Sequence, residues 1–128
     1  MRPSLDEYEA IREAVQRYVD ACLIADHDLL RSALHPKWTM YGIDDGATDV
    51  AVTVDEFVGW VRDREPPEGY RAEITNVESA KHVAAATLVE ENYYGIDYVI
   101  FFSLVRYDGR WTIVTKSYSQ VSPTVPGL

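Results

Sequence analysis

The chain has 128 residues, a length that suits one domain built around one hydrophobic core. Apolar residues make up 47% of it and charged residues 26%, which is ordinary for a globular protein and argues against a disordered chain. The 21 acidic residues outnumber the 12 basic ones, and the net charge is −9. No Lys/Arg cluster interrupts this excess, so we expect neither nucleic acid nor a membrane surface as a partner.

Cysteine content and the N-terminal sequence bear on the compartment. The one cysteine, Cys22, cannot form a disulfide within the chain. Residues 1–4 lead directly into a charged helical segment, and no apolar run reaches about 18 residues, so we recognise no signal peptide and no membrane span. We therefore expect a cytoplasmic protein.

The first half of the chain carries three helical patterns. A helix is predicted over residues 4–24 from apolar side chains at helical spacing: Leu5, Tyr8, Ile11, Val15, Tyr18, Val19 and Cys22. Asp26 is a favourable N-cap for a second helix, which Pro36 ends and which buries Leu29, Leu30, Ala33 and Leu34. A strand over residues 37–43 and a loop at residues 44–46 follow. Thr53 and Glu56 form a capping-box pattern and predict a third helix that ends before Pro66, with one side formed by Phe57, Trp60 and Val61.

The second half alternates strands and turns. Strands are predicted over residues 70–79, 82–93, 96–107 and 110–121, and the tail 122–128 is expected to be irregular. Asp108-Gly109 is a strong signal for a two-residue hairpin turn, and Tyr94-Gly95 is a moderate one. Residues 98–105 are apolar on both sides of the pleat, so this strand must be covered on both faces.

Residues 5–121 resemble the NTF2-like superfamily, specifically its lumazine-binding-like and SnoaL-like branches. The resemblance rests on a helix-break-helix followed by LHP at residues 34–36, on DEFVGWV at residues 55–61, and on SLVRYDGRWTIVTKSY at residues 103–118. It implies an α+β cone in which three N-terminal helices pack on a strongly curved, mainly antiparallel sheet. The interior of such a cone is a pocket for one small molecule, and the open face of the sheet usually meets a second subunit.

Two enzymes of this fold are similar in part. Ketosteroid isomerases carry an oxyanion-hole tyrosine in a QRY stretch, which Gln16-Arg17-Tyr18 matches. The general-base aspartate of that family would fall on Gly42 and its second acid on or near Ser103, so both acids are missing. Scytalone dehydratases are similar at Glu56–Gly59, but their sheet histidines have no counterpart here. Neither activity transfers.

Strand pairing predicts which side chains share a face of the sheet. If both turns contain two residues, one face carries Leu88, Glu90, Asn92, Asp97, Val99, Phe101, Ser103, Val114, Lys116 and Tyr118. The opposite face then carries Tyr98, Ile100, Phe102, Leu104, Trp111, Ile113, Thr115 and Ser117. The isomerase resemblance places Val114, Lys116 and Tyr118 in the pocket. We therefore assign the first face to the cavity and the second to a homodimer interface, an assignment that a one-residue bulge would invert.

The predicted site combines polar groups with an aromatic wall. Candidate catalytic residues are Tyr18, Glu90 and Lys116, where a desolvated carboxylate would act as a base and a lysine would stabilise an enolate-like oxygen. An ordinary ion pair of Glu90 with Lys116 at the mouth of the cone is the alternative. Candidate ligand-binding residues are Trp38, Met40, Phe57, Trp60, Leu88, Asp97, Val99, Phe101, Ser103, Val114 and Tyr118, although the aromatic ones would serve equally as core.

Two functions remain open from the sequence. One is a protein that binds a small apolar or aromatic ligand without catalysis. The other is a cofactor-independent isomerase, dehydratase or cyclase that acts by proton transfer on a small carbonyl compound. The three histidines and the acids show no metal-ligand spacing, so we expect no metal and no cofactor.

Overall fold

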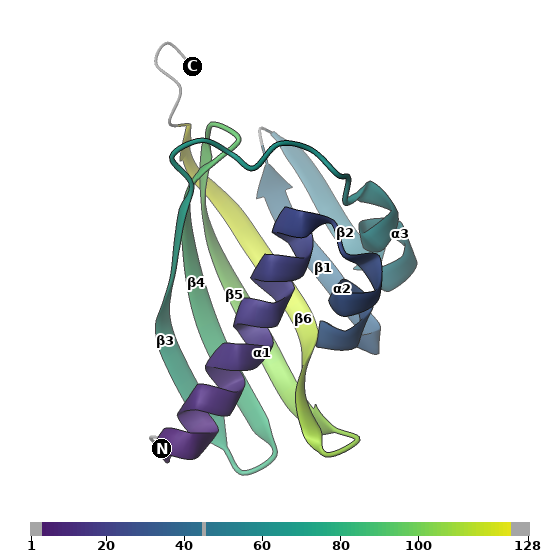
Figure 1. Ribbon diagram of the computed structural model, residues 1–128, viewed down its shortest axis with the longest axis vertical. Coiled ribbons are helices and arrows are strands. Elements are labelled where there is room, and N and C mark those ends of the chain that lie inside the picture. The colour runs from purple at the N-terminus through teal and green to yellow at the C-terminus, as the bar shows by residue number, and fades with distance from the viewer. Residues whose placement is uncertain (1–3, 45, 124–128) are drawn as a thin grey trace.

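A computed structural model describes residues 4–44 and 46–123 as three helices and one six-stranded sheet (Figure 1). In chain order these are α1 (Leu5–Ile24), α2 (His27–Ala33), β1 (Leu34–Asp44), β2 (Ala47–Thr53), α3 (Val54–Trp60), β3 (Arg71–Ala80), β4 (Val83–Tyr93), β5 (Ile96–Tyr107) and β6 (Arg110–Pro123). Within this part of the chain, no helix combines the length and the apolar character needed to cross a membrane. The predicted α+β class is confirmed.

Each helix begins at a side chain that caps its first turn. The Ser4 hydroxyl accepts from the Glu7 backbone N–H at 3.2 Å, and the Asp26 carboxylate accepts from the Leu29 N–H at 3.0 Å. Thr53 and Glu56 form the predicted capping box. The ends of the helices differ more from prediction: α2 ends at Ala33, before Pro36, and α3 ends at Trp60. Residues 61–70 form a long connection that becomes one wall of the site.

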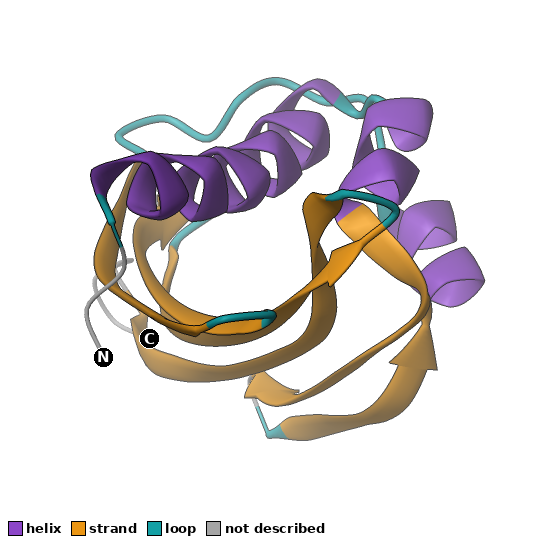
Figure 2. Cartoon of the chain, turned by 90° about the horizontal axis from the view of Figure 1, so that it is seen from below, coloured by secondary structure: helices purple, strands orange, loops and turns teal. Residues whose placement is uncertain are grey.

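The sheet has the strand order β2-β1-β6-β5-β4-β3, and every pair is antiparallel except β1 with β6. Strand β2 was not predicted. The irregular tail was predicted from residue 122, but β6 continues to Pro123. Residues 124–128 lie outside the described residues. Figure 2 shows the sheet curving around α1, which lies across its concave side, and this curvature creates the cone.

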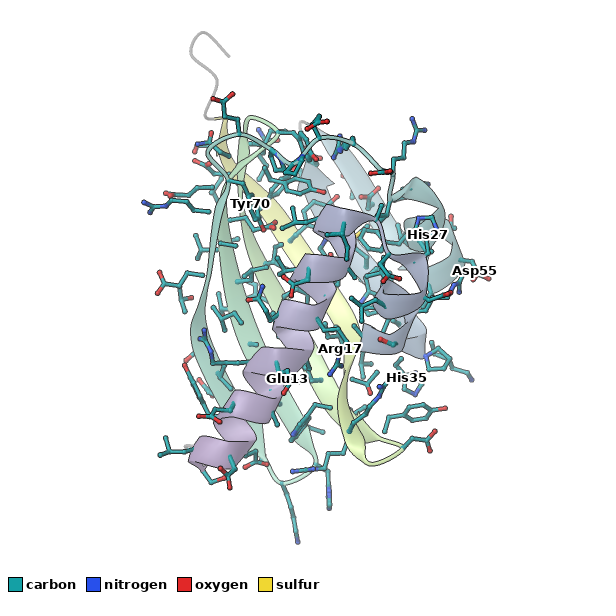
Figure 3. The ribbon with its side chains drawn as sticks, in the orientation of Figure 1. Glu13, Arg17, His27, His35, Asp55 and Tyr70 are labelled. Atoms are coloured by element: carbon teal, nitrogen blue, oxygen red, sulfur yellow. The ribbon has the colours of Figure 1, made fainter. Side chains whose placement is uncertain are left out.

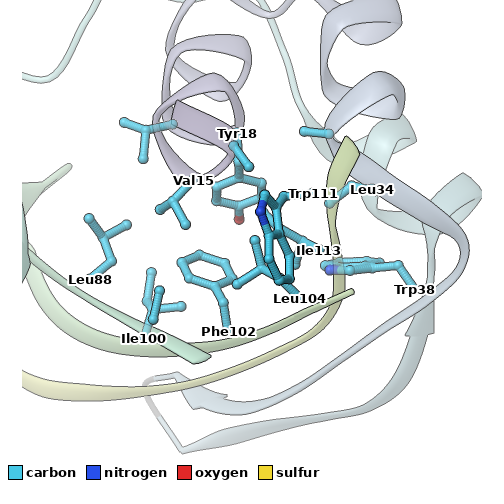
Figure 4. Packing of buried hydrophobic residues seen from close by; sticks show 14 of the residues in the cluster. Val15, Tyr18, Leu34, Trp38, Leu88, Ile100, Phe102, Leu104, Trp111 and Ile113 are labelled. Carbon is cyan, nitrogen blue, oxygen red and sulfur yellow. The ribbon is translucent and has the colours of Figure 1, made fainter. Parts of the chain in front are cut away.

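The inner face of β5 carries the side chains that were predicted for the subunit interface. Tyr98, Ile100, Phe102 and Leu104 are buried, as are Trp111 and Ile113 on β6. Figure 4 shows Ile100, Phe102 and Leu104 on the side of the sheet that faces α1, packed beneath Val15 and Tyr18. The predicted interface through these six residues is therefore wrong, because they form the core of the chain itself.

Two β-bulges explain the error. Both hairpin turns have the predicted form, since Tyr107 pairs with Arg110 and Tyr93 with Ile96. In β6, however, Ser103 pairs with Thr115 and Leu104 with Ile113, so Val114 is an extra residue. In β4, two residues oppose Asp97, one of them Asn92 with φ 60°. Beyond each bulge, the side chains of β4 or β6 lie on the opposite face of the sheet from the one that unbroken pairing with β5 would give them.

The neighbouring phenylalanines of β5 test this assignment of faces. Phe102 is 2% exposed and Phe101 57% exposed. Replacing Phe102 with Ala should lower the free energy of unfolding by about 3–5 kcal/mol, because a large buried ring is lost. The matched change Phe101→Ala should cost less than about 1 kcal/mol. Urea unfolding at chain concentrations where the protein is monomeric measures both, and equal costs would contradict the assignment.

Candidate functional site

A cavity of about 210 Å³ lies between the C-terminal half of α1, α3, the connection 61–70 and the inner face of the sheet. A cavity of about 150 Å³ is large enough to hold benzene. The volume here therefore suits a molecule of one or two rings. Tyr70, labelled in Figure 3, lies at the end of the connection, where the chain enters β3.

The structure brings together most of the polar and aromatic residues that the sequence singled out. The predicted site residues in the cavity wall are Tyr18, Met40, Phe57, Trp60, Glu90, Lys116 and Tyr118. Glu90, Lys116 and Tyr118 share the inner face as predicted, because the bulges turn β4 and β6 over together. Their partners on β5 are Tyr98, Ile100 and Phe102, and not the alternate residues Val99 and Phe101 that were predicted.

Other predicted wall residues lie elsewhere, and their assignment to the cavity is wrong. Val99, Phe101 and Ser103 lie on the outer face of β5, and Val114 is the bulge residue. Asp97 accepts from the Asn92 N–H and the Ser122 hydroxyl at the β4–β5 turn. Trp38 and Leu88, each 1% exposed, belong to the packed core, where Trp38 contacts Phe57 with ring centroids 5.2 Å apart.

Lys116 lies among aromatic rings. Its Nζ donates to the Tyr18 hydroxyl at 2.6 Å and lies 5.0 to 5.3 Å from the ring centroids of Tyr18, Phe57 and Tyr118. The ion pairs of residues 4–44 and 46–123 do not include it, so the predicted alternative of an ion pair with Glu90 is wrong. Burial lowers the pKa of Lys116 and raises the pKa of Tyr18 well above its usual value.

Glu90 has a partner that sequence reasoning missed. The Tyr70 hydroxyl donates to Glu90 Oε2 at 2.5 Å. Burial raises the pKa of Glu90, while the hydrogen bond from Tyr70 and the charge of Lys116 oppose that shift. The pKa of Tyr70 is raised too, by burial and then by Glu90. The sequence did contain a signal for Tyr70, because this residue begins the predicted strand 70–79. That strand pairs with the strand that carries Glu90.

A row of tyrosines continues the wall beyond Glu90. Tyr93 meets Tyr70 and Tyr98 edge to face, with ring centroids 5.9 and 6.2 Å apart, and Tyr98 meets Tyr118 at 5.8 Å. Two acids of the β1–β2 hairpin, neither of them predicted as a site residue, accept hydrogen bonds from tyrosines of this row. Tyr98 donates to Asp44 at 2.8 Å, and Tyr118 donates to Asp49. Burial and these carboxylates raise the pKa of both phenols.

Gly42 explains why an isomerase-type base has no place here. Gly42 and Tyr118 are partners in the pairing of β1 with β6. A Cβ atom added to Gly42 would lie 2.3 Å from the Tyr118 ring, far inside contact distance. The tyrosine ring therefore occupies the space that a side chain at position 42 would need. Among the described residues, no group of His, Cys, Asp and Glu side chains is arranged to hold a metal ion.

A helix-covered, strongly curved sheet with a cavity inside it defines the NTF2-like class, and the comparisons confirm this resemblance. An NTF2-like protein of unknown function from Shewanella baltica OS155 matches with a TM-score of 0.82 and 23% identity, over 95% of this chain and 99% of that one. One from Methylobacillus flagellatus KT has a TM-score of 0.83 and 24% identity, over 94% and 96%. A ketosteroid isomerase-like protein from Erwinia carotovora atroseptica SCRI1043 has a TM-score of 0.70 and 20% identity, over 94% and 100%.

The chain itself belongs to the family described as "Putative lumazine-binding", whose profile matches residues 6–119. A search of curated proteins found no match. The solved structures are below 25% identical and show the fold alone.

Proposed function

We propose that this protein binds one small, largely apolar or aromatic molecule in the cavity of the cone. The observation that carries the proposal is the wall itself, where aromatic rings surround buried polar groups that face open space. Ligand pockets of proteins commonly combine such apolar walls with a few placed polar groups. A volume of about 210 Å³ suits a ligand of one or two rings.

The polar groups indicate what the ligand carries. Lys116 and Tyr18 present hydrogen-bond donors at one position, which suits a carbonyl oxygen. Glu90 and Tyr70 form a second polar position on the neighbouring strands. A small aromatic carbonyl compound satisfies both features. Lumazine, which the family description names, is a two-ring molecule with carbonyl groups and belongs to this class of ligand.

A second candidate function is proton transfer on such a compound. The Glu90 carboxyl is buried and has a raised pKa, as a general base requires. A carbonyl oxygen at Lys116 would place developing negative charge beside an ammonium group and a phenol. This supports an isomerase, dehydratase or cyclase that works without a cofactor.

We further propose that the chain forms a homodimer through the outer face of its sheet. The part of this face on β4, β5, β6 and β1 carries uncharged side chains: Val83, Ala85, Thr87, Val89, Val99, Phe101, Ser103, Val105, Thr115, Ser117, Ser119, Thr39, Tyr41 and Ile43. Phe101 is 57% exposed at its centre. The acids Glu73 and Glu78 of the edge strand β3 lie on the same face, beside this uncharged part. Because the chain has a net charge of −9, a second copy is repelled least by the uncharged part of the face. One face meeting its own copy gives an isologous pair.

Filling the cavity should weaken ligand binding. Leu23 lines the cavity, whereas its neighbour Ile24 is 63% exposed and does not. The variant Leu23→Trp should bind 2-naphthol at least about tenfold more weakly than wild type, since the indole occupies the ligand's space. Ile24→Trp is the matched control and should bind normally. Fluorescence titration of 2-naphthol measures this. Wild-type protein that binds no naphthol, and that carries no small molecule by mass spectrometry after purification, would refute the proposal.

If Glu90 acts as a base, the protein should exchange the methyl protons of acetophenone in D₂O. The carboxylate must be ionised to accept a proton, so the rate should rise with pH over a range above the usual Glu value of 4.5. Glu90→Gln should lose at least about 100-fold in rate. The control is Glu91→Gln, a neighbour whose carboxylate pairs with Arg71 at 3.0 Å on the surface. Proton NMR follows the exchange, and equal rates in the two variants would exclude Glu90 as the base.

Charge placed on the outer face should separate the dimer. Phe101→Asp puts a carboxylate at the centre of the uncharged part of the face and should give folded monomers, because each copy would bury a charge against its twin. Glu73→Gln, on the edge strand β3, should leave the dimer intact. Sedimentation velocity measures the state of each. Wild-type protein that sediments as a monomer at micromolar concentration would contradict the dimer.

A further inference from the structure

We propose that Lys116 is a nucleophile, and that its amine condenses with the carbonyl group of an aldehyde or ketone ligand to form an imine inside the cavity. The inference rests on the proposed ligand binding and goes beyond it, because it assigns a covalent step to one side chain. Its basis is the position of the amine: on the inner face of β6, in the wall of the cavity, with a phenol as its hydrogen-bond partner.

A lysine at this position needs an explanation. Met40 on one side and Phe102 on the other are its partners in the sheet, and both are buried apolar residues. Methionine or leucine would pack here without desolvating a charge, whereas an ammonium group loses its hydration. Three aromatic rings and one hydroxyl replace only part of that hydration, since Lys116 takes part in no ion pair of the described residues. The structure therefore holds a costly group beside open space.

The surroundings favour the reactive form of this amine. Only the neutral amine attacks a carbonyl carbon, and a lysine desolvated in an apolar pocket reaches that form at lower pH than an exposed one. Burial lowers the pKa of Lys116, and the acidic groups of Glu90 and Asp49 oppose that shift. Tyr18 stays a protonated phenol, because burial raises its pKa, and it holds the nitrogen at 2.6 Å.

The condensation is balanced without any other reagent. The amine nitrogen forms a bond to the carbonyl carbon while the electrons of the C=O double bond pass to oxygen. In total the nitrogen gives up two protons, the oxygen leaves with them as water, and a C=N double bond remains. No oxidation or reduction occurs. Glu90 lines the same cavity with a raised pKa, so it is suited to accept the proton from nitrogen and return it to oxygen.

The two other lysines of the chain, Lys37 and Lys81, are exposed and provide an internal control. The protein is incubated near neutral pH with benzaldehyde and cyanoborohydride, which reduces an imine to a stable benzylamine, and peptide mass mapping locates the benzyl group. We expect Lys116 to be modified at least about tenfold faster than Lys37 or Lys81, because binding raises the local concentration of the aldehyde.

Two variants separate the imine from folding effects. Lys116→Met keeps an unbranched apolar side chain that is one atom shorter, and Lys116→Arg keeps the positive charge, but neither has an amine that forms an imine. Both should remain folded, as circular dichroism measures, and both should be labelled at Lys37 and Lys81 alone, at the wild-type rates of those two lysines. Lys81→Met should leave the labelling of Lys116 unchanged.

Benzyl alcohol, which lacks the carbonyl, distinguishes the two ways to fail. If wild type binds benzyl alcohol but benzaldehyde modifies Lys116 no faster than the exposed lysines, the imine is wrong and ligand binding stands. If wild type binds neither compound and Lys116 remains unmodified, both proposals fall. Faster labelling of Lys116 that persists in Leu23→Trp, whose cavity is filled, would also overturn the imine inference, because the reaction would then not take place in the cavity.

Discussion

The packing of α1 on the concave face of the sheet determines which side chains form the core and which line the cavity. Ile100, Phe102 and Leu104 alternate along β5, and each points toward the helix (Figure 4). Once they form the core, the side chains beside them on β4 and β6 must face the same way. Leu88 then completes the core, while Glu90 and Lys116 are directed into the part of the cone that the helix does not fill.

Desolvation dominates the chemistry of that space. Burial is the largest cause of the shifted pKa of Glu90, of Lys116 and of the tyrosines around them. Each shift favours the neutral form, so the cavity as a whole resists carrying charge. The hydrogen bonds within it run from a donor to one defined acceptor, as from Tyr70 to Glu90 and from Lys116 to Tyr18. A bound molecule therefore meets groups that are fixed in position and whose neutral forms are favoured.

Local signals in the sequence predicted the helices and most of the strands. No signal showed which face of the sheet each side chain would occupy, because that depends on pairing between distant residues. Caps such as Asp26 and Thr53, and the turn at Asp108-Gly109, act over a few residues and were found. Val114 carries no mark of a bulge, since a valine fits a regular strand equally well. Asn92 does carry one, because asparagine tolerates the positive φ of 60° that it adopts. Tyr70, Asp44 and Asp49 enter the site only through the closing of the cone, which no local pattern records.

The close approach of Tyr118 to Gly42 also restricts how this chain could change its chemistry over time. Introducing a carboxylate at position 42 alone drives it into the phenol ring. Removing the ring alone opens a void and leaves Asp49 without the phenol that donates to it. The two positions are therefore coupled, because a change at either one alters the surroundings of the other. A carboxylate base at position 42 therefore requires a smaller or displaced side chain at position 118, although the fold stays the same.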